Sequence, residues 1–251
     1  MNSNFIVLTT NRSGSVWVMS TLNSLPEITA QGELFLPRKR KVEKRWDSEF
    51  AIPRYVERAM NGFKPRPFSV FSYLDDLYCT PGTVGFKLMY KQLGLYPEIM
   101  IYLIQHKIKV VHLVRKNHLD VLLSFELKRK IGRAHVLAGQ SAPELIQVSL
   151  DTKTLINNIE KLQRKQDLAR QLLAWFRLPN IEITYEELLR DQANFNIILN
   201  FLSVDPDDNI PTSTLVKIRK GKHRQVISNY NEVQKVLEGT NFSNLLDESV
   251  P

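Results

Sequence analysis

The amino-acid sequence predicts an α/β fold in which helices cover both faces of a central parallel sheet. The first observation is a set of four short apolar runs with the length and composition of buried strands, over residues 5–9, 84–88, 109–114 and 181–184. The second is that helical patterns separate these runs, over residues 16–25, 120–130, 152–176 and 194–202. Strands that alternate with helices favour a parallel sheet between two helical layers.

Length, composition and charge narrow the class of protein. The 251 residues fit a single domain over 1–251, and 43% hydrophobic with 24% charged residues is ordinary for a globular chain. Cys79 is the only cysteine, so no disulfide can form within the chain. Residues 1–8 lack the pattern of a signal peptide and no apolar run approaches a membrane span, so we expect a cytoplasmic protein without a transmembrane segment. The net charge of +8 favours an anionic ligand.

The first loop carries the clearest functional pattern. Residues 10–15, Thr-Asn-Arg-Ser-Gly-Ser, connect the strand 5–9 to the helix 16–25. A strand, a loop of small residues and a helix aim backbone N–H groups at an oxyanion, and Gly14 lets the backbone approach closely. The nucleotide triphosphatase pattern Gly-x-x-x-x-Gly-Lys-Ser/Thr is absent from this loop. Either an anion cradle or an ordinary turn with Arg12 in solvent fits the loop alone.

The loop resembles the 5′-phosphosulfate loop of sulfotransferases that use 3′-phosphoadenosine-5′-phosphosulfate (PAPS) and release 3′-phosphoadenosine-5′-phosphate (PAP). Residues 12–17, Arg-Ser-Gly-Ser-Val-Trp, match the family pattern except at Val16, where a Thr is usual. Arg12 in place of Lys resembles the carbohydrate and protein-tyrosine branch. The resemblance implies a single-domain P-loop-like fold and a donor loop over 9–17, with contacts from Thr10, Asn11, Arg12, Ser13, Gly14, Ser15, Val16 and Trp17.

Three later segments resemble the same family in the same chain order. Residues 112–124 resemble its 3′-phosphate segment, in which Arg115 and Ser124 would bind that phosphate, with Lys116 as an alternative to Arg115. Tyr185 matches a tyrosine that often lies against the adenine, although a core tyrosine fits the position equally well. Residues 217–224 resemble a C-terminal basic clasp on the 3′-phosphate, which the resemblance assigns to Arg219, Lys220 and Gly221.

Sulfuryl transfer needs cations beside the leaving phosphate and a base for the acceptor hydroxyl. Arg12 is the first choice for the cation, and Lys87 within its apolar strand is the second. Many family members place a histidine base where this chain has Met89, so the resemblance shifts the expected base to Glu33, as in the tyrosine and carbohydrate branches. His112 and His118 are fallback bases. No Cys, His or paired-carboxylate spacing indicates a metal site.

The sequence therefore predicts a metal-independent enzyme that moves a sulfuryl group from PAPS to a hydroxyl group. The acceptor stays open among a carbohydrate, a tyrosyl group, a lipid and a small alcohol, and basic runs such as 38–41 would fit an acidic glycan or peptide. The alternatives are a P-loop kinase or nucleotide triphosphatase and a basic nucleic-acid-binding protein. The triphosphatase pattern and recognisable RNA-binding signatures are both missing, so we expect no specific nucleic acid.

Overall fold

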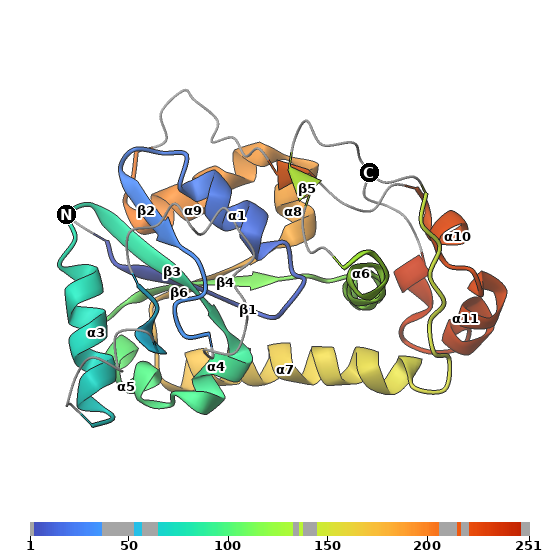
Figure 1. Ribbon diagram of the computed structural model, residues 1–251, viewed down its shortest axis with the longest axis horizontal. Coiled ribbons are helices and arrows are strands. Elements are labelled where there is room, and N and C mark those ends of the chain that lie inside the picture. The colour runs from blue at the N-terminus through green and yellow to red at the C-terminus, as the bar shows by residue number, and fades with distance from the viewer. Residues whose placement is uncertain are drawn as a thin grey trace. The chain divides into compact units, whose positions relative to one another are not determined.

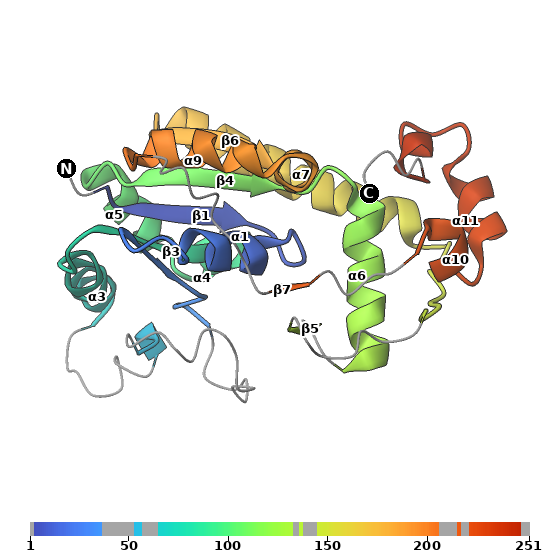
Figure 2. The same ribbon diagram turned by 90° about the horizontal axis from the view of Figure 1, so that it is seen from above.

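The structure, a computed structural model, describes residues 3–36, 53–56, 65–132, 136–137, 145–205, 215–216 and 221–246. Its centre is a five-stranded sheet in the order β2-β3-β1-β4-β6, with every neighbouring pair parallel. The strands are β1 (Phe5–Thr9), β2 (Ile28–Gln31), β3 (Thr83–Met89), β4 (Lys109–Val114) and β6 (Asn180–Thr184). Figure 2 looks onto this sheet and shows β4, β1 and β3 side by side. The predicted α/β class with a parallel sheet is confirmed.

The four predicted strands match β1, β3, β4 and β6 to within one residue at either end. β1 and β3 are buried along their whole length, which is why their sequences are almost continuously apolar. β2 was not predicted, because its sequence, Ile-Thr-Ala-Gln, is short and half polar. This composition suits an edge strand, which pairs only with β3.

Contacts divide the chain into two compact units, the first made of Met1–Val114 and Ala169–Ser213. In this unit α1 and α9 cover one face of the sheet, whereas α3, α5 and the end of α7 cover the other (Figure 1). The helices are α1 (Ser15–Leu22), α3 (Phe68–Tyr78), α4 (Tyr90–Leu95), α5 (Glu98–Gln105), α8 (Tyr185–Arg190) and α9 (Phe195–Leu202), with a 3₁₀ turn η2 (Gln192–Asn194) and the C-terminal part of α7 (Leu155–Trp175). Two hydrophobic cores, one on each face, hold these layers together.

The second unit consists of Arg115–Leu168 and Thr214–Pro251, so the boundary between the units falls within α7. It contains α6 (His118–Ile131), α10 (His223–Val226), α11 (Tyr230–Leu237), the 3₁₀ turn η3 (Ser243–Leu246) and an antiparallel pair of β5 (Val136–Leu137) and β7 (Leu215–Val216). A separate apolar core, with Leu119, Leu123 and Ile159 among its members, stabilises it. The single domain over 1–251 stays a prediction. Across the described parts of both units, each helix is too short or too polar to cross a membrane.

Candidate active site

The loop of residues 10–14 leaves the carboxyl end of β1, the central strand of the sheet. β3 and β2 lie on one side of β1, and β4 and β6 lie on the other. The chain order therefore reverses at β1, and ligands of open α/β sheets bind outside the carboxyl ends of the strands at such a point. The first loop has the position that an anion site of this fold class requires.

Buried hydroxyl groups tie the loop to the sheet. Thr9 Oγ1 lies 2.7 Å from the carbonyl oxygen of Leu113 on β4 and 2.6 Å from Ser13 Oγ, which lies 3.0 Å from the carbonyl oxygen of Thr10. Thr9 and Ser13 are fully buried. The Ser13 hydroxyl thus has partners within the protein, and its predicted contact with the donor stays a prediction.

Two residues of the loop have left-handed backbone conformations. Arg12 has φ of 65°, which is uncommon for a residue with a side chain, and Gly14 has φ of 82° as the N-cap of α1. Gly14 offers no side chain to cap the first N–H groups of the eight-residue helix α1, and such groups favour an anion. Among the other predicted loop contacts Ser15 is buried, and those with partial exposure are Thr10, Asn11, Val16 and Trp17.

Tyr185 packs directly on the loop. A Cβ atom added to Gly14 would lie 2.2 Å from Tyr185 Cδ2 and 2.4 Å from Cε2, far inside any normal contact. The tyrosine ring is 9% exposed and meets Trp17 edge-on at 5.8 Å between ring centroids. Tyr185 therefore has the buried position of a core tyrosine, which is one of the two interpretations that its sequence pattern allows. Its contact with an adenine stays a prediction.

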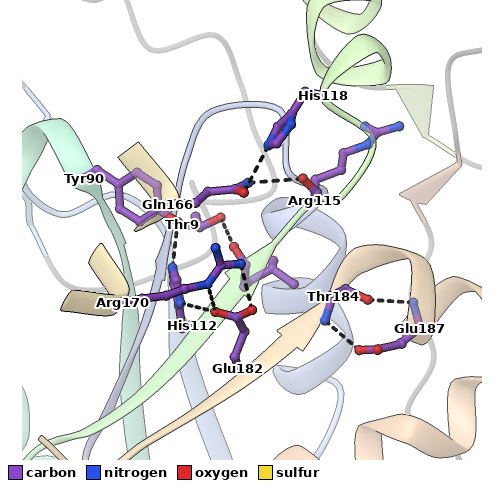
Figure 3. Close-up of polar contacts among 11 residues, drawn as sticks. Thr9, Tyr90, His112, Arg115, His118, Gln166, Arg170, Glu182, Thr184 and Glu187 are labelled. Carbon is purple, nitrogen blue, oxygen red and sulfur yellow. Dashed lines mark hydrogen bonds and ion pairs between the residues drawn. The ribbon is translucent and has the colours of Figure 1, made fainter. Parts of the chain in front are cut away.

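A capping box sets Tyr185 at the first position of α8. The Thr184 hydroxyl accepts a hydrogen bond from the Glu187 N–H at 3.2 Å, and the Glu187 carboxylate accepts one from the Thr184 N–H at 3.0 Å (Figure 3). This reciprocal pair satisfies two N–H groups at the helix start. The end of β6 and the start of α8 thus hold the ring against Gly14.

The structure brings two predicted catalytic residues together. Lys87 Nζ lies 3.0 Å from Glu33 Oε1, and their side chains are only 6% and 13% exposed. Glu33 follows the carboxyl end of β2, while Lys87 lies in the second half of β3, whose Met89 pairs with Thr9 of β1. An ammonium group and a carboxylate therefore lie at the same edge of the sheet as the loop. Their catalytic roles stay predictions.

His112, the first fallback base, is held on both sides. Its Nδ1 lies 2.9 Å from Glu182 Oε2 and its Nε2 lies 2.7 Å from the Tyr90 hydroxyl (Figure 3). Arg170 donates two hydrogen bonds to Glu182, at 2.8 and 2.9 Å. Burial lowers the pKa of His112 against the opposing effect of Glu182. With both ring nitrogens engaged and 1% exposure, His112 acts in this fold as a structural link between strands.

The second unit holds Arg115 in a network of its own. Its Nη2 lies 2.7 Å from Asp120 Oδ2, and Asp120 Oδ1 lies 2.8 Å from His223 Nε2. Gln166 donates to the Arg115 carbonyl at 3.1 Å and meets His118 Nε2 at 3.0 Å (Figure 3). His118, the second fallback base, is thus buried within this network. Asp120 and Gln166 were not singled out from the sequence, because only the fold brings them to Arg115.

The remaining predicted 3′-phosphate residues lie in or beside this unit's described ranges. Ser124 is half-buried on α6, whereas Lys116, the alternative to Arg115, is exposed. Gly221 has φ of 93°, a conformation that favours glycine. Arg219 and Lys220 lie outside the described residues, as do the basic residues 38–41. Within the described ranges, no group of three or more His, Cys, Asp or Glu side chains could hold a metal ion.

Gln92 and Tyr90 are two further residues that sequence reasoning missed. Both lie on α4, which begins immediately after the last residue of β3. Gln92 Nε2 lies 3.4 Å from Glu33 Oε2, and its side chain is fully buried. A signal was present, since polar residues directly after a buried parallel strand lie at the edge where ligands bind.

Comparisons with known proteins give structural matches only. Protein-family models and curated proteins yield no match. A sulfotransferase from Alicyclobacillus acidocaldarius is 16% identical, with a TM-score of 0.50 over 86% of this chain and 87% of the other. The sulfotransferase domain from the curacin biosynthetic pathway is 14% identical, with a TM-score of 0.50 over 100% of this chain and 92% of the other. Mouse SULT7A1 complexed with PAP is a weaker match, with 13% identity and a TM-score of 0.46 over 98% and 87% of the chains. The first two matches show that this chain shares their fold.

Proposed function

We propose that the chain is a PAPS-dependent sulfotransferase that moves a sulfuryl group to a hydroxyl group of an acceptor. The observation that carries this proposal is the loop over 9–17. Its residues resemble a phosphosulfate loop, and it leaves the central strand with Gly14 in the left-handed conformation that starts α1. The fold shared with two sulfotransferases supports the same proposal. No observation favours a kinase, a triphosphatase or a nucleic-acid-binding protein.

Arg12 and the N-terminus of α1 would bind the phosphosulfate end of the donor. A guanidinium stays protonated at physiological pH and offers several N–H donors, so it suits charge stabilisation and not proton transfer. The N–H groups at the start of α1 add a further positive end. In the second unit, we assign the 3′-phosphate to Arg115 and Ser124, and the C-terminal clasp to Arg219, Lys220 and Gly221, on the resemblance alone.

Glu33 would act as the general base for the acceptor. Its carboxylate takes the proton of the acceptor hydroxyl as that oxygen forms a bond to sulfur, and the bond from sulfur to the donor's phosphate oxygen breaks. The electron pair of that bond stays on the phosphate of PAP, where Arg12 and Lys87 stabilise the charge. The 3.0 Å contact between Lys87 and Glu33 supports these roles, because it places a cation and a base in one buried pair.

Titration with PAP tests the donor site. A ligand present at 100 times its dissociation constant stabilises the folded protein by about 2.7 kcal/mol, so the thermal midpoint should rise clearly with PAP. Arg12→Ala should abolish most of this rise, whereas Arg190→Ala, which removes an exposed arginine of α8, should preserve it. A wild-type midpoint that stays constant as PAP is added would contradict the proposed function.

Glu33→Gln separates the acceptor step from donor binding. The amide cannot take a proton, so transfer to carbohydrate and phenolic acceptors should fall by roughly 100-fold or more while the PAP-dependent midpoint shift persists. Glu27→Gln makes the same chemical change at an exposed position and should leave both unchanged. Full transfer by Glu33→Gln would remove Glu33 as the base.

A further inference from the structure

Gln92 links the candidate base to the backbone at the end of β3. Its side-chain oxygen accepts a hydrogen bond from the Met89 N–H at 2.8 Å, and its Nε2 lies 3.4 Å from Glu33 Oε2. The Gln92 side chain is 0% exposed, so its amide group is shielded from bulk water. Glu33 thus has Lys87 on one carboxylate oxygen and Gln92 on the other.

The orientation of the Gln92 amide follows from its partners. A backbone N–H can only donate, so the amide oxygen must face Met89 and the NH₂ group must face Glu33. An NH₂ group also can only donate. It therefore favours an ionised Glu33, which is the form that can accept a proton from an acceptor hydroxyl.

The short helix that carries Gln92 is anchored at its first residue. α4 has six residues, too few to be stable by itself. Tyr90 begins it, and the Tyr90 hydroxyl lies 2.7 Å from His112 Nε2, while Glu182 engages the other ring nitrogen. Burial raises the pKa of Tyr90, so the hydroxyl keeps its proton and donates to the neutral imidazole. α4 is thus held to β4, which fixes the position of Gln92 beside Glu33.

We propose that Gln92 is a positioning residue, which holds the Glu33 carboxylate in place and ionised for proton transfer. This role rests on the proposed function, because it gives Glu33 the part of the base. Gln92 itself touches neither donor nor acceptor in this assignment and acts through Glu33.

The variant Gln92→Glu isolates the donor group. It keeps an oxygen for the Met89 N–H but puts a second oxygen opposite Glu33 Oε2. At low pH the two carboxyl groups share a proton, which restores a donor toward Glu33; as the pH rises the proton leaves and the two groups repel. The rate of sulfuryl transfer to phenol, relative to wild type, should fall roughly 10- to 100-fold between about pH 5.5 and about pH 8.

Thermal unfolding over the same pH range gives a second readout that needs no acceptor. The folded state of Gln92→Glu holds a proton more tightly than the unfolded state, so its midpoint should drop relative to wild type as the pH rises. Gln105→Glu, the same change at an exposed position at the end of α5, should follow the wild-type profile. PAP should still raise the midpoint of both variants.

The outcomes separate the two proposals. Rate and midpoint profiles of Gln92→Glu that run parallel to wild type, with PAP binding intact, would overturn the role of Gln92 alone. A wild-type protein that neither binds PAP nor transfers a sulfuryl group would overturn the proposed function, and with it the positioning role, whatever the midpoint profile shows. A pH-dependent loss of rate beside intact PAP binding would support both.

Discussion

Replacing Gly14 by alanine tests whether the loop conformation depends on both backbone freedom and the contact with Tyr185. At φ of 82° a residue with a Cβ atom costs about 1–2 kcal/mol. The added Cβ would also lie 2.2 Å from the Tyr185 ring, and overpacking of this kind costs about 1–3 kcal/mol more. Gly14→Ala should therefore lower the free energy of unfolding by about 2–5 kcal/mol.

Three other glycines separate these two causes. Gly132 has φ of 74°, and an added Cβ would meet no atom of the described residues within 4 Å, so its alanine variant should show the backbone cost alone. Gly85 has ordinary backbone angles but would place its Cβ 2.5 Å from the Phe5 ring, so it should show the packing cost alone. Gly94 lies in α4 with neither constraint, and alanine there should stabilise the helix by about 0.5–1 kcal/mol.

Urea unfolding of these variants gives the free energies, and PAP titration gives the functional effect. The double variant Gly14→Ala with Tyr185→Ala should cost less than the sum of the two single changes, because the second removes the ring that the first strikes. Gly14→Ala that unfolds no more easily than Gly132→Ala would refute the reasoning. So would strictly additive effects in the double variant.

Two further predictions concern the buried networks. Burial lowers the pKa of His112 in the folded chain. Below about pH 6.5 the unfolded chain therefore binds a proton that the folded chain does not bind, so the free energy of unfolding should fall as the pH drops. His112→Gln should reduce this fall in urea unfolding between about pH 5 and about pH 7.5. An equal fall in both proteins would contradict the assignment. In the second unit, Asp120→Asn replaces one acceptor oxygen of the carboxylate that contacts Arg115 and His223. It should lower the free energy of unfolding by about 1–3 kcal/mol in the same assay. An unchanged free energy of unfolding would show that this network does not stabilise the fold.

Strands buried on both faces could be predicted from the sequence, since burial leaves a continuous apolar run to recognise. β1 and β4 have the bounds that the sequence predicts. β2 could not be found in this way, because Thr29 and Gln31 interrupt its apolar pattern. The strand order could not be predicted either, since periodicity says which residues are buried but not which strands are neighbours.

The residues of the candidate site could likewise be predicted from the sequence only in part. The loop residues form one continuous segment, so their pattern is visible in the sequence. Glu33 and Lys87 could be singled out one at a time, but their 3.0 Å contact depends on the pairing of β2 with β3. The position of Gln92 after β3 marks it only as a residue near the site, because its two contacts, with Met89 and Glu33, are created by the packed α4.

The loop after β1 is clamped from two sides, by the hydroxyl contacts of Thr9 and Ser13 and by the ring of Tyr185 on Gly14. The entropy lost in shaping this loop is therefore lost when the chain folds, and binding of an anion loses little more. Loosening the clamp would move that loss to the binding step. A variant such as Thr9→Val would then bind the same anion through the same contacts, but more weakly and with a less favourable binding entropy.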